Sequence, residues 1–375
     1  MLKRFCICLG LLLISSSSSH VFGSKTVKSQ ASDSATDKEL VQSILIEKCG
    51  FSSPWQKKLF VKDGESIRKM TIHDNYLFVE TSLNYLYCVD RNKGKIMFSF
   101  PVAMENLPLE GPTFYGNEML YMVGNKLHVV DMNAGRVTKI KDYSITGMGA
   151  VYPPVRNEKF IYVADSIARL TAVNAEETSV VFPVSSDKDS LINSVIADDK
   201  YLVFSTKAGE VVRIKTNKPE KIWQFEVEKI QAPMVRDGKW IYVSSLDRKL
   251  YKLSIEDGYS GWIAPFIAGE ELTKSVRIGE DVLYQYAGKK GMFAIDKKSG
   301  DEVWQLREGY DLLCEKGSNA YILAKPSRLV VMDNRKGKKL YSVNFASVTD
   351  YAVNTTDSVI YVAGENGSVM AIDVD

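Results

Sequence analysis

The chain has 375 residues, of which 45% are hydrophobic and 25% are charged, and this ordinary globular composition argues against general disorder. Its 48 basic and 46 acidic side chains leave a formal net charge of +2, which gives no electrostatic reason to expect nucleic acid or an anionic membrane as a partner. With only three histidines, a zinc cluster or histidine-based acid–base chemistry is not expected.

Residues 1–23 have the pattern of a secretory signal peptide. Lys3 and Arg4 precede an apolar stretch that is too short to span a bilayer, and a small-residue segment follows it. Cys6 and Cys8 lie at the start of the apolar stretch rather than after it, so we expect no lipid anchor. The sequence therefore predicts an exported protein, periplasmic or extracellular, that is at most peripheral to a membrane, such as the periplasmic face of an outer membrane.

Residues 24–50 are expected to form a flexible tether. Its first part is rich in polar and small residues, and its last part, from Leu40, could form one or two helical turns. Removal of the signal peptide would leave Cys49, Cys88 and Cys314. An odd number leaves at least one thiol unpaired within the chain, and the sequence does not say which of them pair.

From about residue 75 onward the chain repeats an Asp, a Gly four residues later and an aromatic residue eight residues after the Asp. The most regular copy places these at Asp296, Gly300 and Trp304. Asp can bond the amides ahead of it and Gly tolerates positive φ, so each copy predicts a turn between two strands. The copies recur about every 40 residues, which is a propeller period. The other repeat positions, in copies of which several are degenerate, are Asp90, Gly94, Phe98, Asp131, Gly135, Phe182, Trp223, Gly258, Trp262, Asp333, Gly337, Tyr341 and Asp373.

Each repeat unit divides into short strands. Two apolar runs such as 76–79 and 86–89 precede the Asp turn, a more polar strand with the aromatic residue follows, and the link to the next unit supplies an innermost strand. The sequence therefore predicts an all-β, eight-bladed propeller with four-stranded antiparallel blades over residues 51–375.

The two ends of the repeat region predict how the ring closes. The eighth unit reaches Asp375 without its last strand, while residues 51–62 form an orphan strand that carries Trp55. Pairing of this strand with the last blade would remove the open sheet edge. We therefore expect truncation before Pro54 to remove only the tether, and truncation after Phe60 to open the ring.

The motif from Ala294 to Trp304 resembles the tryptophan-docking repeat of the quinoprotein, or PQQ-type, propellers. The resemblance covers roughly residues 51–375, and it implies that outer-strand aromatic residues pack against the glycine turn of a neighbouring blade. In size and layout the chain is similar to the outer membrane protein assembly factor (BamB) family. That resemblance implies a non-enzymatic scaffold whose loops bind the barrel-forming subunit in outer-membrane protein assembly. Only an Ala-Pro pair in 228–233 matches that family's partner-binding loop, so no binding residue is carried over.

Metal-binding and channel-lining interpretations of single residues are weaker. A calcium array at the Asp turns is disfavoured because cations such as Arg91 and Lys93 stand where a calcium loop places oxygens. His73 and His128 lie in expected strands without a paired ligand spacing, which favours structural roles. Four arginines near strand starts could line a channel mouth, although solvated loop side chains are favoured; they are Arg156, Arg213, Arg236 and Arg277.

Two classes of function remain. The favoured one is a monomeric scaffold that binds a protein through the loops of a rigid ring, with no catalytic residue, cofactor, metal or nucleic acid. The alternative is a ligand-binding propeller whose central channel takes a quinone cofactor or a glycan, with turnover as a quinoprotein oxidoreductase as its enzymatic form. The adjacent cysteine pair of quinoprotein dehydrogenases is absent from the sequence, which favours the scaffold.

Overall fold

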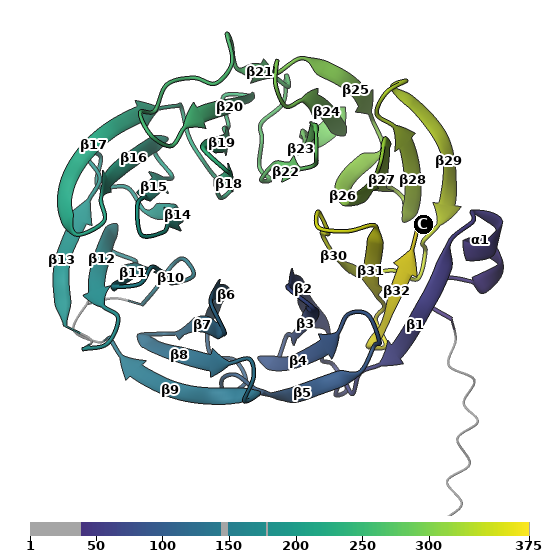
Figure 1. The fold of residues 1–375 in the computed structure, drawn as a ribbon, viewed down its shortest axis with the longest axis horizontal. Helices are drawn as coiled ribbons and strands as arrows, with labels where there is room; N and C mark the ends of the chain where they lie inside the picture. The colour runs from purple at the N-terminus through teal and green to yellow at the C-terminus, as the bar shows by residue number, and fades with distance from the viewer. Residues whose placement is uncertain (1–38, 144–148, 178, 375) are drawn as a thin grey trace, which may run out of the picture. The chain divides into compact units, whose positions relative to one another are not determined.

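The computed structural model describes residues 39–143, 149–177 and 179–374. Within these ranges, eight antiparallel sheets of four strands stand around a central axis (Figure 1), which confirms the predicted eight-bladed propeller. The predicted signal peptide, residues 1–23, and the tether as far as residue 38 lie outside the described ranges. No helix in these ranges is long and apolar enough to cross a membrane.

Each blade takes its strands in chain order from the axis outward, except that β1 joins the last blade. Blades 1 and 2 contain β2 (Ile67–His73), β3 (Tyr76–Thr81), β4 (Tyr85–Asp90), β5 (Ile96–Pro101), β6 (Leu109–Tyr115), β7 (Glu118–Val123), β8 (Lys126–Asp131) and β9 (Arg136–Asp142). Blades 3 and 4 contain β10 (Val155–Arg156), β11 (Phe160–Ala164), β12 (Arg169–Asn174), β13 (Val180–Ser185), β14 (Ile192–Ala197), β15 (Leu202–Thr206), β16 (Glu210–Lys215) and β17 (Lys218–Glu226). Blades 5 and 6 contain β18 (Val235–Asp237), β19 (Trp240–Ser244), β20 (Lys249–Ser254), β21 (Phe266–Ile267), β22 (Arg277–Ile278), β23 (Val282–Tyr286), β24 (Met292–Asp296) and β25 (Glu302–Leu306), with a short 3-10 turn at Gly288–Lys290. Blades 7 and 8 contain β26 (Gly309–Lys316), β27 (Asn319–Ala324), β28 (Arg328–Asp333), β29 (Lys338–Asn344), β30 (Asp350–Ala352), β31 (Val359–Ala363), β32 (Ser368–Asp373) and β1 (Ser52–Lys58).

The position of a strand in its blade explains its sequence pattern. The middle strands are packed between neighbouring blades on both faces, so β3 and β4 are almost continuously apolar and buried. The outermost strand has one face toward solvent, and burial in β5 alternates from residue to residue. The apolar runs recognised in the sequence are therefore the second and third strands of each blade.

The antiparallel topology sorts the connections onto two faces of the ring. The turns after the first and the third strand of a blade lie on one face, which we call the Asp-turn face because it carries the repeated Asp turns. The turns after the second strand and the links between blades lie on the other, the link face. Inner strands such as β2 and β22 surround the axis (Figure 1), so their side chains are the ones that can line a channel.

The last blade is completed by the N-terminal strand, as predicted. β1 pairs antiparallel with β32, and Trp55 stands opposite Ala371. The two ends of the ring are also joined across the interface to blade 1, where the guanidinium of Arg91 pairs with Asp357 at 2.8 Å. Pairing with β1 therefore gives hydrogen-bond partners to the backbone groups along the edge of β32, which would otherwise be unpaired.

The segment before β1 does not behave as the predicted tether up to residue 50. The compact unit begins at Glu39, and α1 (Ser43–Lys48) lies beside β1 (Figure 1). Leu40, Val41, Ile46 and Phe51 are all buried there in one cluster with side chains of blades 7 and 8. The expectation that truncation before Pro54 removes only a tether is therefore wrong, because it would also strip this apolar cover from the two blades.

Candidate functional site

The repeated aspartates form the turns that their spacing predicts. The Oδ1 atom of Asp296 accepts the amides of Lys298 and Ser299 at 2.9 and 2.7 Å, and Gly300 N–H donates to the Asp296 carbonyl at 2.9 Å. These backbone hydrogen bonds, above all that of Ser299, hold the pKa of Asp296 below its ordinary value. The same pair of amide bonds is made by Asp90, Asp131 and Asp333. Each of these carboxylates is thus engaged in its own turn.

At several interfaces an indole from one blade docks on the Asp turn of the next. Trp55 is typical, because its Nε1–H donates to the Arg91 carbonyl at 2.8 Å and its ring covers Gly94. A Cβ on Gly94 would lie 2.6 Å from Trp55 Cδ2, so a larger residue there would displace the ring. The acceptor is always the residue after the first turn position, as shown by Trp223 to Ile255 O at 3.2 Å, Trp262 to Lys297 O at 3.3 Å and Trp304 to Asn334 Oδ1 at 2.8 Å.

The glycines of the repeat lie under these aromatic rings. Cβ atoms built on Gly258 and Gly300 would meet Cδ2 of Trp223 and Trp262 at 2.9 and 2.8 Å. Gly135 has the same relation to Phe98, whose Cβ would be 2.8 Å away. Gly337 is less tightly covered, with the nearest atom of Trp304 at 3.7 Å. The close approach of ring and turn, together with positive φ, explains the choice of glycine.

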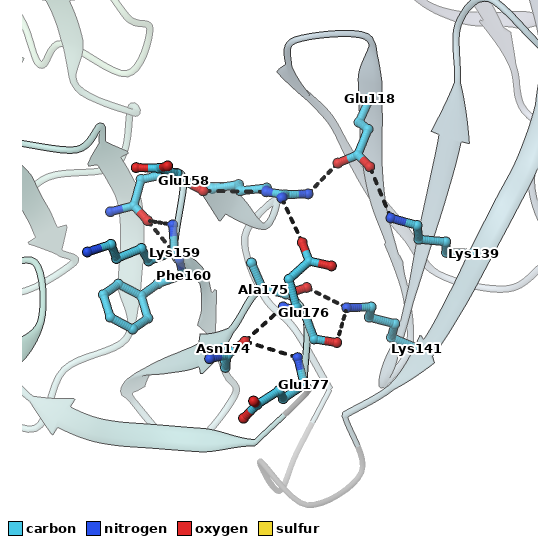
Figure 2. Close-up of polar contacts among 12 residues, drawn as sticks. Glu118, Lys139, Lys141, Glu158, Lys159, Phe160, Asn174, Ala175, Glu176 and Glu177 are labelled. Carbon is cyan, nitrogen blue, oxygen red and sulfur yellow. Dashed lines mark hydrogen bonds and ion pairs between the residues drawn. The ribbon is translucent and has the colours of Figure 1, made fainter.

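Between blades 2 and 3 an apolar core is present, but a lysine, instead of an aromatic ring, reaches the turn of the next blade. Lys139, which occupies the aromatic position of the second unit, pairs within blade 2 with Glu118 at 3.5 Å. Lys141 reaches across to donate to the carbonyls of Ala175 and Glu176, as Figure 2 shows. Ala175 is the residue after the first turn position, so the ammonium of Lys141 occupies the place that an indole N–H takes elsewhere.

The two remaining interfaces differ again from the repeat. Phe182 is buried between blades 3 and 4, and the neighbouring Tyr162 hydroxyl donates to the Thr216 carbonyl at 2.9 Å, the equivalent acceptor. Tyr341 lies beside Phe51, with 6.2 Å between the centroids of the two rings. The N-terminal segment thus contacts the aromatic position of the seventh unit.

The four arginines that might have been solvated are in fact all bound to neighbouring groups. Arg156 is only 11% exposed and pairs with Glu118 and Glu176. Arg213 is buried in the middle of β16 rather than near a strand start, and it donates to the Glu256 carbonyl. Arg236 pairs with Asp198 at 2.6 Å, and Arg277 pairs with Asp311. The expectation of solvated loop arginines is therefore wrong, because each guanidinium reaches across a blade interface and donates to a carboxylate or a carbonyl of the neighbouring blade.

Arg277 belongs to a cluster of charged side chains around the buried carboxylate of Asp311. Its Nε and NH2 donate to the two carboxylate oxygens of Asp311 at 2.8 and 2.9 Å. The Tyr351 hydroxyl donates to the same carboxylate at 2.8 Å, and Lys274 Nζ lies 3.8 Å away. Burial alone would raise the pKa of Asp311, but Arg277 and Lys274 outweigh burial and hold that pKa below its ordinary value. One carboxylate therefore links blades 6, 7 and 8.

Replacing Asp311 by asparagine is expected to lower the free energy of unfolding by about 2–3 kcal/mol at neutral pH. The loss is below that of a fully buried pair because the Arg277 side chain is 32% exposed. The pKa of Asp311 is lower in the folded than in the unfolded chain. Its ion pair therefore contributes fully to the free energy of unfolding above the unfolded-state pKa, and this contribution is lost as the pH falls through the folded-state pKa. Urea unfolding at neutral and acidic pH should show that the difference in free energy of unfolding between wild type and variant becomes smaller below about pH 4. A difference in free energy of unfolding that stays the same at acidic pH would contradict the ion pair. The control is the same substitution at an exposed position, Asp301→Asn.

A cavity of about 790 Å³ opens on the Asp-turn face beside this cluster. Its described lining includes basic and acidic side chains in equal number and no aromatic ring. Several of these charges are already paired, for example Lys297 with Asp237 at 2.8 Å and Arg277 with Asp311. The cavity can take polar groups, but it has neither a surplus of one charge nor an aromatic surface on which a planar cofactor would stack.

The histidines and cysteines of the described ranges occupy structural positions. His73 stacks on Phe114 with 3.9 Å between ring centroids, and His128 Nδ1 lies 2.9 Å from the Val102 carbonyl oxygen. No group of three or more His, Cys, Asp or Glu side chains in these ranges could hold a metal ion. Cys88 and Cys314 are buried and free, and Cys49 is partly exposed and also free. Burial raises the pKa of Cys88 to about 12.

The fold and its docking contacts define an eight-bladed propeller of the tryptophan-docking class. The sequence model described as outer membrane protein assembly factor BamB matches residues 55–225 and 207–313. Because these stretches cover more than half of the chain, the chain belongs to that family.

Individual relatives are distant. The chain is 21% identical over 198 residues to the outer membrane protein assembly factor BamB of Shewanella oneidensis, covering 48% of this chain and half the length of that relative. The crystal structure of BamB from Moraxella catarrhalis is similar with a TM-score of 0.64 at 12% identity, over 86% of this chain and 97% of the other. A computationally designed protein, Ika8, is similar with a TM-score of 0.65 at 12% identity, over 84% of this chain and 98% of its own. Likeness to solved structures at this identity shows the fold alone.

Proposed function

We propose that the protein is an exported, non-enzymatic scaffold in outer-membrane β-barrel protein assembly. The observation that carries the proposal is its family membership over residues 55–313. In this proposal the propeller works as a monomer at the periplasmic side of the outer membrane, without cofactor or metal. Its partner is another protein of the assembly machinery, bound by loops of the ring.

The construction of the ring supports a scaffold. Ring closure by β1 and the docking contacts between blades hold the loops in fixed relative positions. Loops on a rigid support are where binding surfaces usually lie, because their sequences can vary without disturbing the core. The buried carboxylate of Asp311 and those of the repeat aspartates are engaged in ion pairs or turns. This also favours a scaffold over an enzyme.

A pull-down from solubilised native membranes tests the proposal. Residues 24–375 serve as bait, and bound proteins are identified by mass spectrometry. We expect recovery of the barrel-forming subunit of outer-membrane protein assembly. The designed propeller Ika8 is a matched control bait, since it shares the fold at 12% identity. Equal recovery by both baits, or a preparation with no bound protein, would contradict the proposal, and quinone and calcium titrations followed by tryptophan fluorescence would then test the alternative ligand-binding function.

A further inference from the structure

The link face of blades 6 and 7 carries an excess of positive charge. Its loops span 268–276, 287–291, 307–308 and 325–327, in two blades that lie side by side (Figure 1). The acidic residues in these loops are Glu270, Glu271 and Glu308. We call the basic residues of these loops and the adjoining strand start the basic rim; they are Lys274, Lys289, Lys290, Arg307, Lys325 and Arg328.

Most side chains of the basic rim form no close ion pair. Lys289, Lys290, Arg307, Lys325 and Arg328 are exposed, and none forms an ion pair with any residue that the structure describes. The nearby Glu308 is already paired, to Lys339 at 3.1 Å. This differs from the Asp-turn face, where the cavity lining balances its charges. In these link-face loops, by contrast, basic side chains outnumber acidic ones.

Two tyrosines form the centre of the basic rim. The rings of Tyr286 and Tyr310 pack edge to face with 5.2 Å between centroids. Lys274 Nζ and Lys325 Nζ lie 3.3 and 4.4 Å from the centroid of the same Tyr310 ring. Two ammonium groups thus share one aromatic ring, and a cation–π contact neutralises neither positive charge.

The carboxylate nearest to these ammonium groups cannot neutralise both of them. Asp311 lies 3.8 Å from Lys274, but both of its oxygens already accept hydrogen bonds from Arg277. The hydroxyls of Tyr286 and Tyr310 make no hydrogen bond with the described residues and are free to donate. The cluster therefore combines the unpaired ammonium group of Lys325, and that of Lys274, which shares the Asp311 carboxylate with Arg277, with unused hydroxyl donors. Such a set of donors is the complement of a carboxylate.

We propose that this cluster binds carboxylate side chains of an acidic segment in a partner protein. The inference rests on the proposed scaffold function and assigns the part of the link face that a partner contacts. A protein segment is favoured over a membrane surface because Lys274 is only 27% exposed and reaches inward to a buried carboxylate. A single side chain can extend to that depth, whereas a flat layer of lipid headgroups contacts only the exposed outer cations.

Fluorescence anisotropy with a labelled peptide of alternating Glu and Gly tests the binding directly. The matched probe replaces every Glu by Gln. We expect the acidic peptide to bind the intact chain and the Gln peptide not to bind, with affinity falling as salt is raised because the contacts are ionic. Inorganic phosphate and vesicles of phosphatidylglycerol with phosphatidylcholine are the competing probes, and both are expected to bind more weakly than the acidic peptide.

A pair of double variants locates the site. Lys274→Gln with Lys325→Gln removes both ammonium groups from Tyr310 and is expected to weaken binding of the acidic peptide by about tenfold. Lys159→Gln with Lys298→Gln removes the same charge from exposed positions of the Asp-turn face and should leave the affinity within about twofold. Tyr286→Phe with Tyr310→Phe keeps both rings and should weaken binding through loss of the hydroxyl donors. Unchanged thermal unfolding of each variant shows that the fold is intact.

Several results would overturn the inference. Equal weakening by the two lysine pairs would mean that only net charge matters, and absence of peptide binding would mean that there is no site. Vesicle binding that depends on Lys274 and Lys325, without peptide binding, would assign the cluster to lipid instead. These outcomes are separable from the proposed function, because a scaffold that meets its partner elsewhere would still recover it in the pull-down with the lysine variant as bait.

Discussion

Replacing Trp304 by alanine is expected to lower the free energy of unfolding by about 3–5 kcal/mol, the range for a large buried aromatic side chain. Trp304 is 4% exposed and its ring lies 5.9 Å from that of Tyr284. Its indole N–H donates to Asn334 Oδ1 across the interface between blades 6 and 7. Urea-induced unfolding followed by circular dichroism measures the loss.

A second substitution at the same position separates packing from hydrogen bonding. Trp304→Phe keeps most of the aromatic contact and removes only the N–H donor, so we expect a smaller loss of about 1–2 kcal/mol. Asn334 would keep its hydrogen bond to the Tyr284 hydroxyl at 2.7 Å. A change below about 1 kcal/mol for the alanine variant is the range of surface positions and would show that Trp304 does not pack between blades.

Removal of the closing strand, β1, is expected to lower the free energy of unfolding more than any single substitution. A chain that starts after Phe60 lacks β1, and with it Trp55, the cover of Gly94 and the partner of β32. The loss should exceed the about 3–5 kcal/mol of one buried aromatic side chain, because the edge of β32 is exposed as well. Differential scanning calorimetry of the truncated chain should show a much lower melting temperature or no cooperative transition.

Two longer chains serve as controls for ring opening. A chain that starts at Glu39 keeps the whole compact unit and should melt like the full chain. A chain that starts at Pro54 loses Leu40, Val41, Ile46 and Phe51 from their cluster and should melt at an intermediate temperature. Similar melting temperatures for the Pro54 chain and the chain that starts after Phe60 would contradict closure by β1.

The sequence by itself determined the architecture of this protein. The turn around Asp296 and Gly300 forms from hydrogen bonds within five consecutive residues, so its spacing is readable without any tertiary information. The middle strands are buried on both faces, so their apolar runs are continuous and identify each unit. Period, strand number and the orphan strand with Trp55 together predicted eight blades and their closure, which the sheet topology confirms.

Only the tertiary structure decided how unlike units are joined and where charge gathers. Lys141 takes the place of an indole, and Phe51 lies beside Tyr341, because the fold brings together segments that are far apart in the sequence. Likewise, the pairing of Arg277 with Asp311 joins blades 6 and 7, and the cation–π contact of Lys325 with Tyr310 joins a loop of blade 7 to its innermost strand. Such contacts depend on side-chain direction and on the rotation between blades, and neither is encoded in a local spacing. The candidate binding cluster was therefore invisible in the sequence, although the ring that carries it was not.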